Sequence, residues 1–140
     1  MLLDVINCLG GLSKLKAKLQ EVAVRIRKDD IQNIGIIVDA DGEGIDNRIS
    51  LINKELQDIC SDINITEECK FFYSDELSVN IACVINNIDG YGELETVLKK
   101  IKKNNSLYAD CLESWRKCVE STGEKVSQKN FDKLWVWNDP

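Results

Sequence analysis

Apolar residues recur at two different spacings along the first half of the chain, and the change in spacing separates helices from strands. From Leu12 to Ile26 they return every three or four residues, which is typical of a helix with one buried face. Ile34–Val38 is instead a short continuous run of apolar residues and Gly, which favours a strand buried on both faces. The helical spacing returns from Ile45 to about Cys60. The order is therefore helix, strand, helix.

Further elements are predicted on both sides of this group. Leu2–Cys8 mixes branched apolar residues with Asp4 and Asn7 and is interpreted as a strand that ends at a pair of glycines. Phe71–Tyr73 and Val79–Ile85 are predicted strands, because each is a short run rich in aromatic or β-branched residues. Alternating strands and helices indicate right-handed parallel crossovers.

The last third of the chain is predicted to be helical. Three groups of apolar residues at helical spacing mark three helices, which begin near Leu94, Leu107 and Phe131. We therefore expect residues 1–140 to form a single α/β domain. It would contain a mainly parallel sheet of about four strands with flanking helices, and a helical C-terminal part.

Composition narrows the functional classes. The chain has 140 residues, of which 44% are hydrophobic and 30% charged, as in ordinary globular proteins. Its formal net charge of −6 argues against a broad basic surface for nucleic acid, although a metal ion can still bridge to phosphate. The sequence contains neither a membrane-length apolar run nor a signal peptide. We expect a cytoplasmic protein without a membrane partner.

The six cysteines do not form a recognisable metal-binding pattern. No pair is spaced as C-x-x-C, and the chain contains no histidine, so a zinc site and a Ser-His or Cys-His nucleophile are disfavoured. We expect small buried hydrophobic residues in a reducing compartment, with no disulfide and with Cys83 and Cys111 buried.

Asp39 and Asp41 are the strongest candidates for a functional site. They follow the predicted strand Ile34–Val38, and Gly42 and Gly44 after them permit a sharp turn and close approach of a ligand. In open α/β sheets, ligands bind beyond the carboxyl ends of strands. Two neighbouring carboxylates there suit a hard cation such as Mg²⁺ or Mn²⁺.

Three other interpretations of this acidic pair remain open. In a calcium-binding EF-hand loop that starts at Asp39, position 12 would be Ser50 instead of the usual Glu, and a predicted strand leads in where an EF-hand has a helix. In a haloacid-dehalogenase-like phosphatase, Asp39 would be the nucleophile and Asp41 the general acid, but Glu43 replaces the usual Thr. In the third interpretation, the pair only caps a turn before a helix.

Three motifs together resemble the Toprim domain of topoisomerases, primases and related nucleases. The glycine turn Gly10-Gly11 and the later Asp39-Ala40-Asp41 occur in the Toprim order and spacing. The segment IDGYGELE, residues 88–95, is similar to the Gly-x-Leu-Glu signature of an uncharacterised prokaryotic family of Toprim-like proteins, with Gly92, Leu94 and Glu95 in the signature positions. The resemblance covers roughly residues 2–137.

The resemblance implies phosphoryl transfer on nucleic acid. It makes Asp39 and Asp41 the Mg²⁺ ligands, makes Glu95 a third, catalytic carboxylate, and assigns ligand-binding turns to Gly10-Gly11 and Gly92. Glu95 is equally well explained as an acidic residue in the first turn of a helix. An ATPase or another protein is the implied partner.

One Toprim feature has no counterpart in this sequence. The Toprim Glu would precede the Gly10 strand, with which this chain begins. We therefore expect a Toprim-like domain that lacks its first strand, or a divergent inactive form, with little or no nuclease activity alone. The alternative is a non-catalytic module of the same fold that binds another protein.

Overall fold

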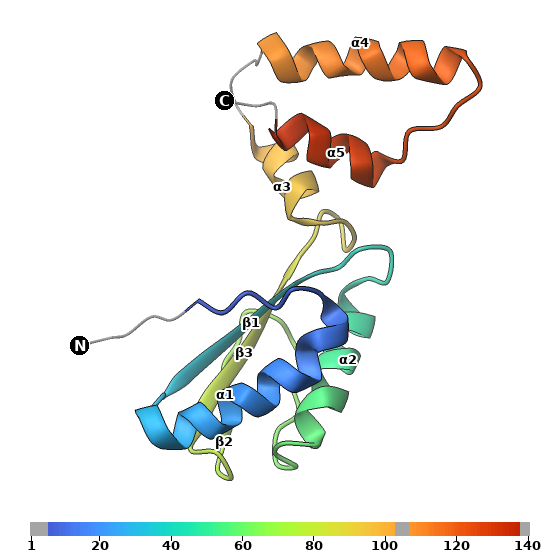
Figure 1. Ribbon diagram of the computed structural model, residues 1–140. Helices are drawn as coiled ribbons and strands as arrows, with labels where there is room; N and C mark the ends of the chain where they lie inside the picture. The colour runs from blue at the N-terminus through green and yellow to red at the C-terminus, as the bar shows by residue number, and fades with distance from the viewer. Residues whose placement is uncertain (1–5, 103–106, 138–140) are drawn as a thin grey trace. The chain divides into compact units, whose positions relative to one another are not determined.

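The computed structural model describes residues 6–102 and 107–137 and has a mixed α/β architecture (Figure 1). The described residues divide into two compact units. The first unit contains the residues up to Val38 together with Asp46–Ile85, and the second contains Asp39–Ile45 together with the residues from Asn86 onward. Whether the chain is a single domain stays a prediction.

The first unit combines helices α1 and α2 with a three-stranded sheet. The helices are α1 (Leu15–Asp29), preceded by the 3-10 turn η1 (Leu12–Lys14), and α2 (Ile45–Gln57); the strands are β1 (Asn33–Asp39), β2 (Phe72–Ser74) and β3 (Val79–Asn86). The strand order is β1-β3-β2. These elements follow the predicted helices and strands closely.

The directions of the strands differ from the expected sheet. β3 runs parallel to β1, and the Asn80 N–H donates to the Gln32 carbonyl at 2.9 Å. β2 is antiparallel to β3, with Phe72 opposite Ile81. The expectation of about four mainly parallel strands is therefore not confirmed, since the three described strands form one parallel and one antiparallel pair.

The predicted N-terminal strand is not present where the chain is described. Within the described residues, Ile6–Cys8 has no strand conformation, and residues 2–5 of the predicted strand lie outside them. Ile6 is 93% exposed, so this segment buries no apolar face that would stabilise a strand. The prediction was wrong for Ile6–Cys8.

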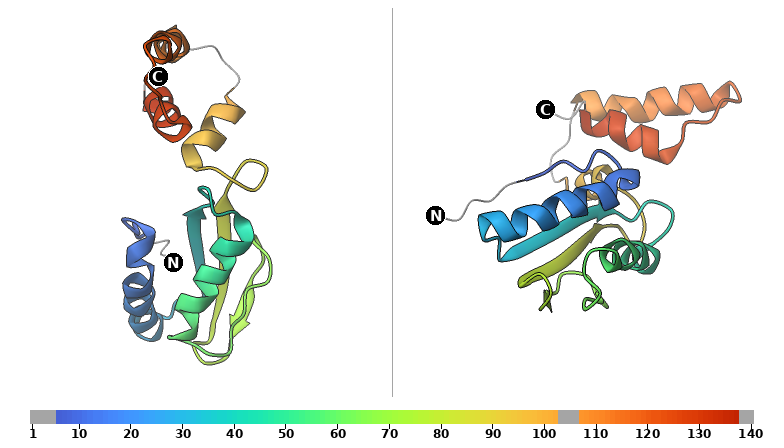
Figure 2. Two further views of the ribbon diagram at one scale, coloured as in Figure 1. Left: turned by 90° about the vertical axis from the view of Figure 1, so that its right-hand side faces the viewer. Right: turned by 60° about the horizontal axis from the view of Figure 1, so that its bottom comes forward.

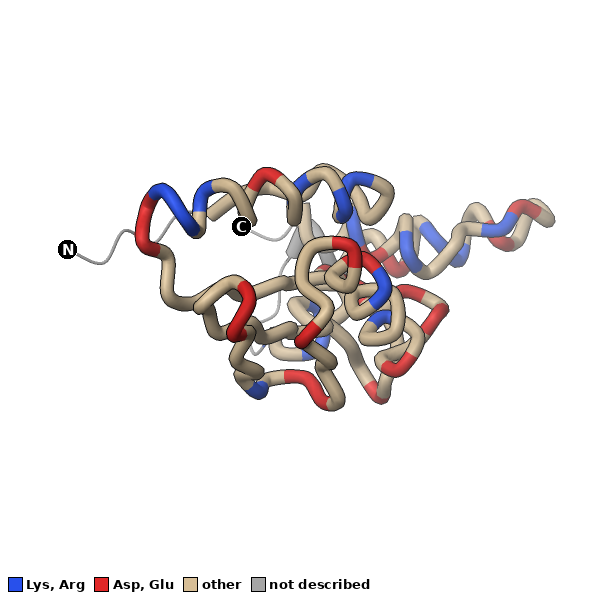
Figure 3. The backbone as a smooth tube through the Cα atoms, turned by 90° about the horizontal axis from the view of Figure 1, so that it is seen from below, with Lys and Arg blue, Asp and Glu red and all other residues tan. Residues whose placement is uncertain are grey.

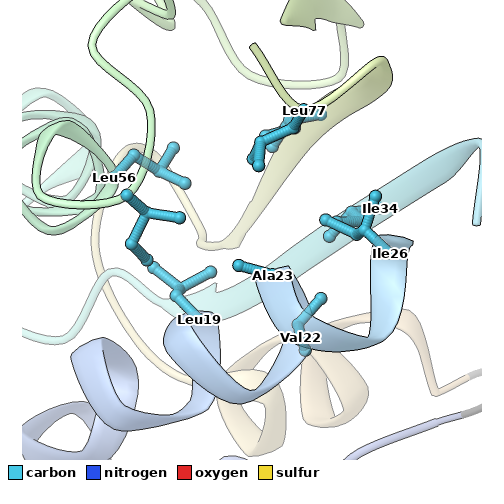
Figure 4. Close-up of a pocket in the computed structure, with 9 residues that line it drawn as sticks. Leu19, Val22, Ala23, Ile26, Ile34, Leu56 and Leu77 are labelled. Carbon is cyan, nitrogen blue, oxygen red and sulfur yellow. The ribbon is translucent and has the colours of Figure 1, made fainter. Parts of the chain in front are cut away.

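One face of the sheet carries the core of the first unit. Side chains alternate along β1, where Ile36 and Val38 are buried and Ile37 is 64% exposed, so β1 is covered on one face and the prediction of burial on both faces was wrong. Figure 4 shows side chains of α1, among them Leu19, lying near Ile34 of β1 and Leu56 of α2 around a small apolar space. The space has a volume of only about 10 Å³, so the core is closely packed.

The second unit contains three helices: α3 (Leu94–Ile101), α4 (Leu107–Ser121) and α5 (Gln128–Trp137). Helices α4 and α5 lie side by side in both views of Figure 2, and α3 contacts α5. Phe131 and Trp135 of α5 form the buried core, and Leu112 of α4 packs against it. The α5 helix begins after Ser127, whose hydroxyl accepts a hydrogen bond from the Asn130 N–H at 3.3 Å.

The cysteine expectations are confirmed in one case and wrong in another. Cys83 is fully buried in β3, and burial raises the pKa of its thiol. Cys111 is exposed instead. It precedes Leu112, the α4 residue that packs on Phe131 and Trp135, and successive helix residues point about 100° apart. That no cysteine forms a disulfide stays a prediction.

Neither the charged residues nor the apolar residues are concentrated in one long segment of the described chain. Basic and acidic residues are interspersed along the chain (Figure 3). In the stretches that the structure describes, no helix is both long and apolar enough to cross a membrane.

Candidate functional site

The predicted acidic loop and the predicted glycine loop lie side by side in the second unit. The Asp41 N–H donates to the Gly92 carbonyl at 2.7 Å, and the Gly92 N–H donates back to the Asp41 carbonyl at 2.9 Å. Gly92 has a φ of +101°, and a Cβ there would meet Thr96 at 3.4 Å. The positive φ therefore favours glycine at this position. The two loops that sequence analysis singled out form one site.

Asp39 holds the start of α3. Its Oδ1 accepts a hydrogen bond from the Leu94 N–H at 3.1 Å and another from the Asn86 side-chain amide at 3.0 Å. Within the described part of the chain, Glu93 at the N-cap position gives α3 no side-chain capping bond. Asp39 thus supplies the capping acceptor from a distant part of the sequence, and its negative charge is favoured at a helix N-terminus.

Replacement of Asp39 with Ala is expected to lower the free energy of unfolding by about 1 kcal/mol, because the Leu94 N–H loses its acceptor. Asp39→Asn should cost less, since the amide oxygen can still accept this bond. Urea unfolding monitored by circular dichroism measures both values. Equal destabilisation by the two variants would contradict the capping role.

Asp41 and Glu93 share one lysine. The Lys129 ammonium on α5 lies 3.1 Å from Oδ1 of Asp41 and also contacts Oε1 of Glu93. Lys133, one turn further along α5, lies 3.5 Å from Oε2 of Glu93. The hydrogen bonds from Lys129 to Glu93 and Asp41 raise the pKa of Lys129 above its usual value. Lys129 therefore remains a cation at neutral pH.

These side chains line an open hollow of about 560 Å³. Its lining contains acidic, basic, amide, hydroxyl and aromatic groups from the two loops, α3 and α5. The residues are Asp41, Gly42, Ile88, Tyr91, Gly92, Glu93, Thr96, Gln128, Lys129 and Asp132. A concave site with a few converging polar groups is the usual form of a ligand pocket.

Asp132 forms the inner wall of the hollow and is only 2% exposed. Its carboxylate accepts hydrogen bonds from Gln128 at 2.7 Å, from Thr96 at 3.2 Å and from Lys99 at 3.4 Å. A buried carboxylate needs such partners, because an unpaired one would be strongly destabilising. Asp132 thus connects α3 to α5 and fixes the shape of the site.

The structure brings together only part of the predicted set. Asp41 and Gly92 line the hollow, whereas Oδ1 of Asp39 is used to cap α3. Glu95 lies in the first turn of α3 and is absent from the described residues that line the hollow. Gly10 and Gly11 belong to the first unit, where both have positive φ directly before η1.

Sequence analysis missed Glu93, Lys129 and Asp132. Glu93 is the variable position of the Gly-x-Leu-Glu segment, so the signature directed attention to Glu95 and not to Glu93, which lines the hollow. Asp132 carried a usable signal, because an acidic residue beside Phe131 in a helix with an apolar face must find a partner when buried. Lys129 carried none, since an exposed lysine at the start of a helix is ordinary.

The Asp41–Glu93 pair fits a small divalent cation. Over residues 6–102 and 107–137, no three Asp, Glu, Cys or His side chains gather closely enough to enclose a metal ion. Mg²⁺, however, is commonly held by one or two carboxylates and completes its shell with water and substrate phosphates. Both carboxylates already contact a single cationic atom, the Lys129 Nζ, and so can reach one shared cation.

The second unit is thus mainly α-helical, and its hollow contains two carboxylates, Asp41 and Glu93, that share the Lys129 ammonium. The chain belongs to the family described as "Protein of unknown function (DUF3226)", whose pattern matches residues 3–137. No curated protein and no solved structure shows a significant match to the chain.

Proposed function

We propose that this protein is a Toprim-like domain that processes nucleic acid with Mg²⁺ or Mn²⁺. The proposal includes the finer architecture of a mainly parallel sheet of about four strands, and a protein partner such as an ATPase. The observation that supports it is that Asp41 and Glu93 both contact the Lys129 ammonium, beside the Gly92 loop. Here Glu93 takes the role that the resemblance gave to Asp39.

The residues of the hollow have separate tasks in this proposal. Asp41 and Glu93 hold the metal ion, which supplies neutralisation of phosphate charge. Tyr91 is exposed at the hollow and offers an aromatic face on which a base can stack, a contact worth about 1–3 kcal/mol. Asp132 holds α3 and α5 together beneath the site.

The metal site is tested by calorimetric titration of the purified chain with Mn²⁺ and Mg²⁺. We expect weak binding that is lost in Asp41→Asn/Glu93→Gln, because the double variant removes both anionic ligands while keeping their shape. Asp89→Asn is the matched control: it removes an exposed carboxylate outside the hollow lining and should leave binding unchanged.

Nucleic-acid binding is measured in the same samples by fluorescence anisotropy with labelled single-stranded DNA and RNA. The metal ion should strengthen binding relative to EDTA in the wild type and in Asp89→Asn, but not in the double variant. A wild-type chain that binds no divalent cation, or binds one equally well in the double variant, would overturn the proposed site.

A second candidate is a non-catalytic module that binds another protein. Leu94, Leu98 and Ile101 recur at helical spacing along α3 and are all exposed, which is typical of a helix face that contacts a partner. A chain that binds neither divalent cations nor nucleic acid would favour this candidate.

A further inference from the structure

We propose that Lys129 is a built-in competitor of the divalent cation, so that its ammonium group and a metal ion occupy the space between Asp41 and Glu93 in turn. This inference rests on the proposed function, because it concerns the same two carboxylates. It adds a step that regulates metal binding: the metal ion binds only when the Lys129 ammonium moves away from Asp41 and Glu93.

The contacts of Lys129 support this exchange. Its Nζ lies 3.1 Å from Asp41 and also contacts Glu93, so the ammonium group occupies the point on which both carboxylates converge. A lysine ammonium is a compact point charge, and it can take the place of a small cation. A metal ion bound by both carboxylates would need the same space.

Exposure indicates which side chain moves. The side chain of Lys129 is 56% exposed, whereas that of Glu93 is 8% exposed and that of Asp41 is 30% exposed. The carboxylates therefore belong to the fixed wall, and the lysine reaches over them from α5. Its long, flexible stem allows the ammonium group to move into solvent without any change in the backbone.

Lys133 provides the matched comparison. It carries the same charge on the same helix and contacts Glu93 at 3.5 Å, but its contact is with the other oxygen, Oε2. Removal of either lysine makes the surroundings of Glu93 more negative. Only removal of Lys129 also vacates the position between the two carboxylates.

The experiment compares Mn²⁺ and Mg²⁺ affinities of the wild type, Lys129→Met and Lys133→Met by calorimetry. Methionine keeps the approximate length and removes the charge. Lys129→Met should bind the metal ion at least about tenfold more tightly, which corresponds to only ~1.4 kcal/mol. Solvent screens the exposed ammonium of Lys129, but its partner Glu93 is largely buried, so loss of the contact should produce an effect of this size. Lys133→Met should change affinity by less than about threefold.

A second readout measures metal binding on the wild-type chain itself and uses a variant only to assign the signal. In lysine-selective ¹H–¹⁵N NMR, the Lys129 ammonium signal, assigned with the Lys129→Met spectrum, should shift or broaden on addition of Mg²⁺, while that of Lys133 changes less. An unchanged Lys129 signal at saturating Mg²⁺ would overturn the exchange.

The results separate failure of this inference from failure of the proposed function. If the wild type and Lys129→Met bind the metal ion equally well, or if Lys133→Met gains as much affinity as Lys129→Met, Lys129 is not a specific competitor although the metal site exists. If neither the wild type nor Lys129→Met binds a divalent cation, the proposed function and the exchange both fail.

Discussion

Replacement of Phe131 with Ala is expected to destabilise the second unit by about 3–5 kcal/mol, the usual cost of removing a fully buried phenylalanine. Phe131 is 0% exposed and lies at the centre of the core that α5 forms with its neighbours. Its ring also carries two cations: the Lys99 ammonium is 4.2 Å and the Arg116 guanidinium 4.8 Å from the ring centroid. Loss of these cation–π contacts destabilises the unit further, in addition to the effect of the cavity that the substitution leaves.

Urea unfolding monitored by tryptophan fluorescence measures this change. Trp137→Ala is the control, because it removes an aromatic side chain from the same helix that is 77% exposed, and it should alter the free energy of unfolding by no more than about 0.5 kcal/mol. Phe131→Leu should fall between the two. Similar values for Phe131→Ala and Trp137→Ala would show that α5 does not form the core described above.

The helices and central strands could be predicted because their apolar spacing depends only on local geometry. The antiparallel direction of β2 could also have been deduced from the sequence, although it was not predicted. Only residues 75–78 separate β2 from β3, and a parallel connection needs a dozen or more residues, so this pair had to be antiparallel. The spacing of the apolar residues alone carries no information on strand direction, which the loop length decides.

Only those features of the candidate site that depend on neighbouring residues in the sequence could be predicted. Asp41 and Gly92 were singled out because each lies in a turn after an apolar strand. The contact between Asp39 and Leu94 joins residues 55 positions apart, and that between Asp41 and Lys129 joins residues 88 positions apart. Such pairings depend on how α3 and α5 pack, which the spacing of apolar residues does not specify.

The purified chain is expected to cleave nucleic acid slowly or not at all, even with Mg²⁺ or Mn²⁺. Metal-assisted phosphoryl transfer needs both a metal ion and a side chain that accepts a proton. Such general acid–base catalysis typically increases the rate by about 10²–10⁴-fold. Histidine, whose ordinary pKa lies closest to neutral, is absent from the sequence. Lys129 cannot take its place, because a lysine that has moved into solvent stays protonated at neutral pH.

Incubation of the chain with plasmid, single-stranded DNA and RNA, in the presence of either metal ion, measures the cleavage rate. Lys129→Met provides the sharper comparison: it should bind the metal ion more tightly, yet it should cleave no faster, since the substitution frees the cation position without adding a proton acceptor. Rapid cleavage by the wild type that Asp41→Asn abolishes and Asp89→Asn preserves would contradict this prediction. In that case one of the carboxylates of the hollow, Glu93 or Asp132, would have to accept the proton despite its contacts with lysine.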